Sequence, residues 1–320
     1  MSTATLQSPG YLPVATETLT PATVVNCDLY IQRQGAPRPE LYCGRNHPLS
    51  PADIDRLRSD GVNFVYIHLE DAESYRQYLC EHVLNQKELS VTSRVKTLRN
   101  VAQASFQHAL GVKDCDQVVQ LSKGLGRDMA TLLTEQPIVF NDLFATLEHD
   151  YYTFTHVCNV SVYCVMLASL LGTTDQVQLA ELATAGLLHD LGKRHIPSKI
   201  LNKPGKPTDA EWELIREHPV SGFRELSTRG DLTWAQLMVI YQHHEKLDGS
   251  GYPAGVMDSD IHRWAKICAI VDVFDALTCQ RPYRQAMPLK EVSDYLEKNA
   301  GQWFDREFVA CWLSHVRTMS

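Results

Sequence analysis

Imidazole and carboxylate side chains gather in the second half of this 320-residue chain in a pattern that suits a metal site. Seven of the thirteen histidines fall between His149 and His244, and clustering of this kind indicates metal binding. His189 stands next to Asp190, and His243 stands next to His244. Imidazoles combined with carboxylates that can bridge suit divalent iron, manganese, nickel or zinc. A single histidine on a helix is more often structural, so the prediction depends on the combination.

The surroundings of these side chains predict that they are buried. His189 and Asp190 end the apolar run AELATAGLLHD, and the pair at 243–244 ends LMVIYQHH. Asp272 lies among small and apolar residues in KICAIVDVFDAL. An ionised carboxylate in such surroundings is costly unless it is paired or metal-bound. The alternative for Asp272, a structural acid bonded to a helix cap, fits poorly because aspartate is a weak helix former in mid-helix.

Helices are the elements that must position these residues. The run from Thr208 to Glu211 has the form of a capping box and predicts a helix that leads toward His218. Either Asp231 or Thr233 can cap the next helix, which ends at the histidine pair. The further predicted helices cover residues 261–279, 289–299 and 305–316. An all-α domain follows from this pattern.

The first part of the chain has a different character. Residues 24–31 and 62–67 are rich in β-branched and aromatic side chains and predict strands. A helix is expected over 51–59, with Ser50 as its N-cap and proline in its first position. A regulatory or dimerisation role is the default for such an appended module. We predict a mainly α protein with a small α/β module over 1–85, a helical linker over 86–145 and an all-α domain over 146–320 that contains the candidate metal ligands.

The bulk composition narrows the classes of function. A net charge of −8 argues against broad nucleic-acid binding, which needs a basic face. The nine cysteines include no CxxC pair, and the N-terminus has no secretory pattern, so a reducing compartment is expected. The uncharged stretch 157–174 is interrupted by polar residues and predicts a buried core helix, not a membrane span. We therefore expect a cytoplasmic protein that binds neither DNA nor a membrane.

Two motifs formed by these residues resemble the signatures of the HD-GYP family, a branch of the HD metal-dependent phosphohydrolases. They are HDLGK at 189–193 and HHEKLDGSGYP at 243–253. Three further elements agree in order, namely YTFTH at 152–156, EHP at 217–219 and DVFDALTCQRPYRQA at 272–286. The resemblance covers about 146–320. It implies an all-α HD-type helical bundle that hydrolyses cyclic di-GMP, a bacterial second messenger.

Carried over residue by residue, the resemblance implies a site for two divalent metal ions. It surrounds one metal with His156, His189, Asp190 and Asp272, and the second with Asp190, His218, His243 and His244. Iron or manganese is expected, with nickel or zinc as alternatives. Some family members bind a third metal through a glutamate at the position of Tyr152, so the sequence predicts two metals. The main product is then the linear dinucleotide pGpG, with slow conversion to GMP.

The same resemblance suggests roles for the remaining site residues. A hydroxide bridging the metals is expected to attack phosphorus in line, with Asp190 as the shared ligand. Lys193 is expected to steady that hydroxide or a phosphate oxygen. Arg281 and Arg284 are predicted to bind the phosphates of the substrate, since a guanidinium fork matches phosphate oxygens. Tyr252 is predicted either to stack on guanine or to pack internally.

The resemblance also suggests partners. Cyclic di-GMP is the expected substrate, and the GYP loop is a candidate contact for cyclase domains or other proteins. The sequence leaves open whether the chain forms a homodimer. One alternative function is hydrolysis of another cyclic dinucleotide, because the metal ligands would be unchanged. The other is a receptor that binds the messenger without turnover, whose usual mark would be a lost ligand. All seven candidate ligands are present in this chain.

Overall fold

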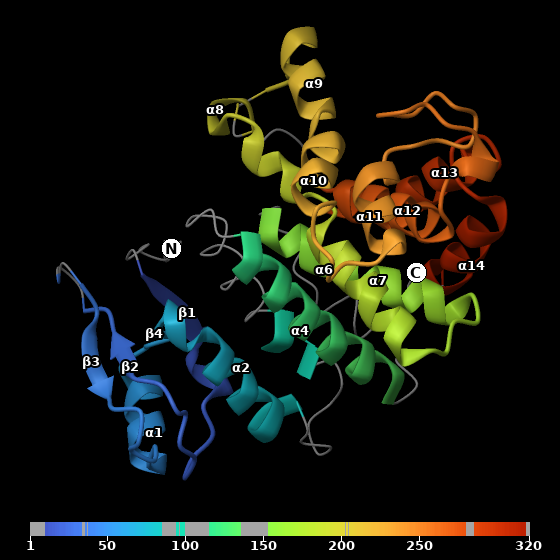
Figure 1. Cartoon of the computed structure of the whole chain (residues 1–320). Helices are drawn as coiled ribbons and strands as arrows, with labels where there is room; N and C mark the ends of the chain where they lie inside the picture. Colours follow the sequence, from blue (N-terminus) through green and yellow to red (C-terminus); the bar gives the residue numbers. More distant parts are fainter. Residues whose placement is uncertain are drawn as a thin grey trace. The chain divides into compact units, whose positions relative to one another are not determined.

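A computed structural model of the chain shows two compact units, Met1–Leu121 and Ser122–Ser320 (Figure 1). It describes residues 10–84 except 34, 35 and 37, residues 94, 95 and 97–99, residues 115–135, and residues 153–317 except 202, 204 and 280–284. The predicted linker over 86–145 therefore lies largely outside the described residues. Helix α4 (Cys115–Glu135) is the longest described element within that range.

The second unit is helical, as the sequence predicts. Its main helices are α6 (Thr153–Leu170), α7 (Gln176–Leu188), α9 (Asp209–Arg216), α10 (His218–Leu226), α11 (Trp234–Gln242), α12 (Arg263–Thr278), α13 (Leu289–Lys298) and α14 (Arg306–Val316). Shorter helical turns are η4 (Leu191–His195), α8 (Ser198–Leu201) and η5 (Asp258–Asp260). The predicted fold class, mainly α with a small α/β module, is confirmed.

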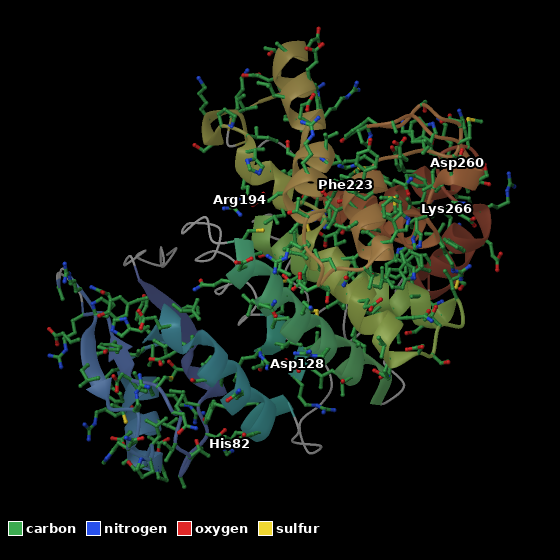
Figure 2. All side chains as sticks on the ribbon, viewed as in Figure 1. His82, Asp128, Arg194, Phe223, Asp260 and Lys266 are labelled. Atoms are coloured by element: carbon green, nitrogen blue, oxygen red, sulfur yellow. The ribbon has the colours of Figure 1, made fainter. Side chains whose placement is uncertain are left out.

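Helix α6 is the centre of this unit. It packs against α7, α12 and α14, and its side chains from Thr155 to Ala168 are buried. A helix that is apolar on all sides belongs in a core, which explains the uncharged stretch in the sequence. Helices α10 and α11 also pack together, and the ring centre of Phe223, labelled in Figure 2, lies 5.1 Å from that of Tyr241. Within the part of the chain that the structure describes, no helix is long and apolar enough to span a membrane.

Local hydrogen bonds fix where the helices begin. Thr208 and Glu211 form the predicted capping box at the start of α9. Thr233, not Asp231, caps α11, in a second capping box with Gln236. Asp231 instead accepts a hydrogen bond from the guanidinium Nε of Arg229 at 2.9 Å. These caps fix the start of α9, which leads to His218, and the start of α11, which leads to the histidine pair at 243–244.

Residues 10–84 of the first unit, as far as the structure describes them, form a four-stranded antiparallel sheet with two α-helices. Its strands are β1 (Tyr11–Ala15), β2 (Leu29–Ile31), β3 (Glu40–Cys43) and β4 (Phe64–His68), in the order β1-β4-β2-β3. Its helices are α1 (Pro51–Ser59) and α2 (Ala72–Leu79), with η1 (Thr16–Thr18), η2 (Leu69–Asp71) and η3 (Cys80–Leu84) as shorter turns. Ser50 caps α1 as predicted. The predicted strands overlap β2 and β4, whereas β1 and β3 were missed.

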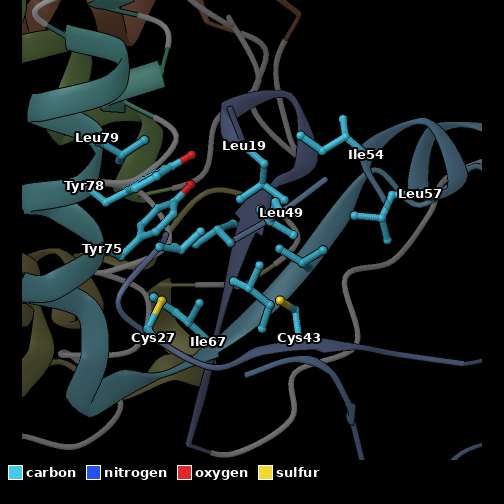
Figure 3. Packing of buried hydrophobic residues seen from close by; sticks show 14 of the residues in the cluster. Leu19, Cys27, Cys43, Leu49, Ile54, Leu57, Ile67, Tyr75, Tyr78 and Leu79 are labelled. Carbon is cyan, nitrogen blue, oxygen red and sulfur yellow. The ribbon is translucent and has the colours of Figure 1, made fainter. Parts of the chain in front are cut away.

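Alternation along the strands builds the core of this unit. Leu12 and Val14 of β1 are buried, as are Val65 and Ile67 of β4, because successive side chains point to opposite faces of a sheet. The two helices cover the buried face with apolar and aromatic side chains (Figure 3). The labelled members on the helices are Ile54, Leu57, Tyr75, Tyr78 and Leu79.

Candidate metal centre

The seven predicted ligands lie together in the second unit. Their potential ligand atoms fall into two groups, each within 4.8 Å: Asp190, His218, His243 and His244 in one, and His156, His189 and Asp272 in the other. Six of the seven are buried, and the side chain of His244 is 24% exposed. The structure therefore brings together residues that are up to 116 positions apart in the sequence, in two groups that correspond to the two predicted metal positions.

Helix ends supply most of these side chains. His156 lies in the first turn of α6, and His189 and Asp190 directly follow α7. His218 opens α10, and the pair at 243–244 directly follows α11. Asp272 is the exception, because it lies in the middle of α12. The chain leaves the helix at these ends, so a short side chain can turn toward a common point.

Two glycines allow the elements to approach closely enough. A Cβ atom on Gly192 would lie 1.9 Å from the carbonyl oxygen of His218. A Cβ atom on Gly186 would lie 2.8 Å from the Cα atom of Ser161 in α6. No side chain fits at either contact, because in both cases the obstacle is backbone. These glycines let the His189–Asp190 segment lie against both α6 and the start of α10.

Asp190 lies between the two groups and presents one carboxylate oxygen to each. Its Oδ2 atom is 3.4 Å from Nε2 of His189 and 3.7 Å from Nε2 of His156. Its Oδ1 atom is 3.3 Å from Nε2 of His218 and 3.9 Å from Nε2 of His243. Burial opposes ionisation, yet the neighbouring Lys193 ammonium and the imidazoles hold the pKa of this carboxyl well below its usual range. A bridging ligand needs this charge and this placement.

Backbone carbonyls orient three of the histidines. The Nδ1 atom of His189 lies 2.7 Å from the carbonyl oxygen of Gly186, and that of His218 lies 2.7 Å from the carbonyl oxygen of Ile215. Nδ1 of His243 lies 3.1 Å from the carbonyl of Val239. An Nδ1–H that donates to a carbonyl leaves the lone pair on Nε2, which is the arrangement of histidine ligands in metal sites.

Several buried side-chain nitrogen and oxygen atoms in the centre have no favourable hydrogen bond to the described part of the chain. The buried atoms Nε2 of His189 and Oδ1 of Asp190 accept or donate no hydrogen bond within the described part of the chain. The Nε2 atoms of His218 and His243 lie 3.2 Å apart, although in this tautomer both carry lone pairs. Buried polar atoms are nearly always paired, so an unpaired set of this kind indicates a ligand site. Divalent metal ions fit this donor set.

Burial also keeps most of these imidazoles neutral. It lowers the pKa of His218 to about 3 and that of His244 to about 4, and it places the pKa of His243 well below its usual value. Neutral imidazole is the form that binds a metal. For His156, burial lowers the pKa, but hydrogen bonds to Asp272 and Asp275 outweigh burial and raise it well above the ordinary value.

Asp275 is a site residue that sequence reasoning missed. It is completely buried, and its Oδ2 atom lies 2.7 Å from Nδ1 of His156. The amide of Asn159 donates to its other oxygen at 2.8 Å. Nε2 of His156 is thereby directed at Oδ1 of Asp272, 3.0 Å away. The spacing of these residues could have indicated this role. Asp275 follows Asp272 by three residues, and Asn159 follows His156 by three residues. Residues three apart share a helix face.

The remaining predicted site residues have varied surroundings. Lys193 donates to Oδ2 of Asp190 at 2.5 Å. The ring of Tyr252 stacks on His244 with ring centres 4.7 Å apart, and burial raises its pKa above the ordinary value. Arg281 and Arg284 lie outside the described residues, as does Tyr152. Their predicted roles, and that of Tyr252 with guanine, stay predictions.

Known proteins resemble part of this chain in sequence. Cyclic di-GMP phosphodiesterase PA4108 from Pseudomonas aeruginosa is 42% identical over 136 residues, covering 42% of this chain and 33% of that protein. The 3'3'-cGAMP-specific phosphodiesterase 1 from Vibrio cholerae is 41% identical over 148 residues, covering 45% of this chain and 33% of that protein. The chain spans about a third of the length of these curated relatives.

A solved structure has a similar fold, and a known protein family matches the sequence. Bd1817, an HDG"Y"P protein from Bdellovibrio bacteriovorus, superposes with a TM-score of 0.65 at 18% identity, covering 97% of this chain and 99% of that chain. This likeness concerns the fold alone. The family described as HD domain matches residues 137–308, which is more than half of the chain. The chain belongs to the HD domain family, and the predicted resemblance to the HD-GYP proteins is confirmed.

Proposed function

We propose that this member of the HD domain family is a metal-dependent phosphodiesterase that hydrolyses cyclic di-GMP to linear pGpG, with slow further conversion to GMP. The observation that carries the proposal is the position of Asp190, which presents one buried oxygen to each of two groups of imidazoles. Relatives named as cyclic dinucleotide phosphodiesterases support the choice of substrate. The activity belongs to the second unit, which contains all seven candidate ligands.

The proposed site holds two divalent ions, with iron or manganese as the first candidates. His156, His189 and Asp272 would hold one ion, and His218, His243 and His244 the other. Asp190 would bind both. When bound, such a pair lowers the pKa of a shared water toward neutrality and stabilises charge on the attacking and leaving oxygens.

Protein groups prepare the site for this chemistry. Carbonyl acceptors hold the imidazoles of His189, His218 and His243 with Nε2 directed inward, so little reorganisation is needed when a ligand binds. The ammonium of Lys193 lies against Asp190, and its side chain is 21% exposed. It can therefore donate to a phosphate oxygen of a substrate at the centre while it keeps the carboxylate ionised.

A second candidate substrate is 3'3'-cGAMP. The observation that favours it is the similarity to a 3'3'-cGAMP-specific phosphodiesterase, which is as strong as that to a cyclic di-GMP enzyme. Both substrates present the same phosphodiester to the metals. Discrimination between them must come from groups that contact the bases.

Turnover by the purified chain, loaded with Mn²⁺ or with Fe²⁺ under anaerobic conditions, tests the proposal. Cyclic di-GMP and 3'3'-cGAMP are supplied separately, and chromatography resolves the cyclic, linear and mononucleotide species. We expect pGpG to accumulate ahead of GMP. A metal-loaded chain that binds cyclic di-GMP but releases no product would show a receptor instead, and faster turnover of 3'3'-cGAMP would reassign the substrate.

A further inference from the structure

Arg216 lies at the edge of the candidate metal centre. It is the last residue of α9, two positions before the candidate ligand His218, and its side chain is exposed. Its guanidinium carbon lies 5.4 Å from the centre of the Tyr252 ring, an arrangement typical of a cation held on an aromatic face. The guanidinium of Arg216 thus lies on a neutral ring.

Tyr252 connects this arginine to the centre. Its ring stacks on the imidazole of His244, with ring centres 4.7 Å apart and an interplanar angle of 29°. The charges of Lys193, Asp272 and Asp190 also act on its hydroxyl group. The same ring therefore contacts both the guanidinium of Arg216 and the imidazole of the candidate ligand His244. A group bound at Arg216 would lie beside the metal positions and not on them.

Three other arginines of the second unit have acidic partners. Arg194, labelled in Figure 2, pairs with Glu225 at 3.0 Å. Arg229 pairs with Asp231 at 2.9 Å, and Arg317 pairs with Glu297 at 2.6 Å. Among the described residues, no carboxylate forms an ion pair with Arg216. Its guanidinium N–H groups therefore remain available for an acidic ligand.

We infer that Arg216 binds the second phosphodiester of the cyclic dinucleotide, the one that is not cleaved. The inference rests on the proposed function, because a cyclic dinucleotide carries two such anionic groups on opposite sides of its ring. The phosphate at the metals is the cleaved one. The other needs a cation away from Asp190 and Asp272, and a guanidinium fork matches its two free oxygens.

A contact to the distant phosphate acts on binding more than on the chemical step. It is present equally in the ground state and in the transition state, so its loss raises KM and leaves kcat nearly unchanged. A substrate with only one phosphodiester has nothing to place at Arg216. Such a substrate separates this role from a general effect on the metal centre.

The experiment compares Arg216→Gln and Arg216→Lys with wild-type chain, using cyclic di-GMP and bis(p-nitrophenyl) phosphate as substrates. Arg224→Gln is the matched control, because Arg224 is an exposed arginine on α10 without an ion pair among the described residues. We expect Arg216→Gln to raise the KM for cyclic di-GMP about 10- to 100-fold, with Arg216→Lys intermediate. For the single-phosphodiester probe, kcat/KM should change by less than about threefold. The control should match wild type with both.

Direct binding keeps the outcome independent of turnover. Calorimetry with cyclic di-GMP and metal-loaded chain should give a dissociation constant about 10- to 100-fold higher for Arg216→Gln, at unchanged metal content. An unchanged dissociation constant, or an equal loss with both substrates, overturns the assignment of Arg216. Wild-type chain that turns over neither substrate contradicts the proposed function instead, and the calorimetric comparison then still decides the role of Arg216.

Discussion

Two sets of buried polar groups, the tyrosine hydroxyls of α2 in the first unit and the candidate metal centre in the second, differ in their hydrogen bonding. In the first unit, the hydroxyl of Tyr75 is hydrogen-bonded to Thr18, and that of Tyr78 accepts from the backbone N–H of Thr20 at 2.7 Å. In the second unit, the buried atoms Nε2 of His189 and Oδ1 of Asp190 have no hydrogen-bond partner among the described residues. Paired groups serve stability, whereas unpaired groups at the meeting point of several helices indicate a ligand site. Each of the following changes tests that contrast.

The largest effect is expected from Asp190→Ala. Removing the carboxylate that faces both groups should abolish tight binding of both metals and lower turnover of cyclic di-GMP by about three orders of magnitude or more. Metal content per chain and product formation are measured together. Asp71→Ala is the control in the first unit, where it breaks an ion pair with Arg45. It should leave the metal content unchanged, and full activity of Asp190→Ala would sink the proposed mechanism.

Acid should destabilise the metal-free second unit. The folded pKa values of His218 and His244 are about 3 and about 4, whereas an unfolded chain titrates near 6.5. Only the unfolded chain gains these protons as the pH falls from about 6.5 toward 4, so the free energy of unfolding should decrease by a few kcal/mol. The pKa of His156 is raised in the folded chain. Its contribution to the free energy of unfolding therefore decreases as the pH rises above about 6.5, and it does not change between about pH 6.5 and 4.

Tryptophan fluorescence measures this unfolding selectively. All five tryptophans lie between Trp212 and Trp312, so denaturation curves at several pH values report on the second unit. A free energy of unfolding that stays constant or rises between pH 6.5 and 4 would contradict the neutral state of these buried imidazoles.

A smaller effect on metal binding is expected at Asp275, which is hydrogen-bonded to the candidate ligand His156. Asp275→Asn removes the charge beside His156 and should weaken metal binding about 10- to 100-fold. The double variant Asn159→Asp with Asp275→Asn exchanges the two groups, so that the amide can accept from His156 and donate to the new carboxylate. It should recover part of the affinity if orientation of His156 is the role of Asp275. Asp294→Asn, an exposed change on α13, serves as control.

Calorimetric metal titration separates these outcomes. Equal affinities of Asp275→Asn and wild type would show that His156 needs no orienting partner. A double variant no better than the single one would assign the effect to charge alone.

The smallest effect is expected in the first unit. Tyr78→Phe leaves the Thr20 N–H without its acceptor and should lower the free energy of unfolding of that unit by about 1–2 kcal/mol. Hydrogen exchange at the β4 amides measures the loss, and metal content should not change. Tyr11→Phe is the matched control, because the described contacts of that tyrosine are ring contacts, not hydroxyl hydrogen bonds. If Tyr78→Phe lowers metal binding, the stability of the first unit and metal binding by the second unit are coupled.

Short-range patterns could be predicted well. The capping box at Thr208, the N-cap at Ser50 and the helix over Arg263–Thr278 depend on residues within a turn or two of each other. The prediction was weaker for strands, and β1 and β3 were missed because they are short and lack a clear alternating pattern. Pairing with β4 and β2, and not local preference, makes them strands.

By itself, the sequence determined which side chains could bind metal and on which helix ends they stand, because residue type and helix signals are local properties. Only the tertiary structure decided how they meet. His156 and Asp275 are 119 residues apart in the sequence, and no local rule connects them. The same holds for the division of the two Asp190 oxygens between the groups, and for the contacts of the Tyr252 ring with His244 and Arg216. These contacts depend on how closely whole helices pack. Where the His189–Asp190 segment meets α6 and α10, Gly186 and Gly192 permit that packing, because there is no room for a side chain at either position.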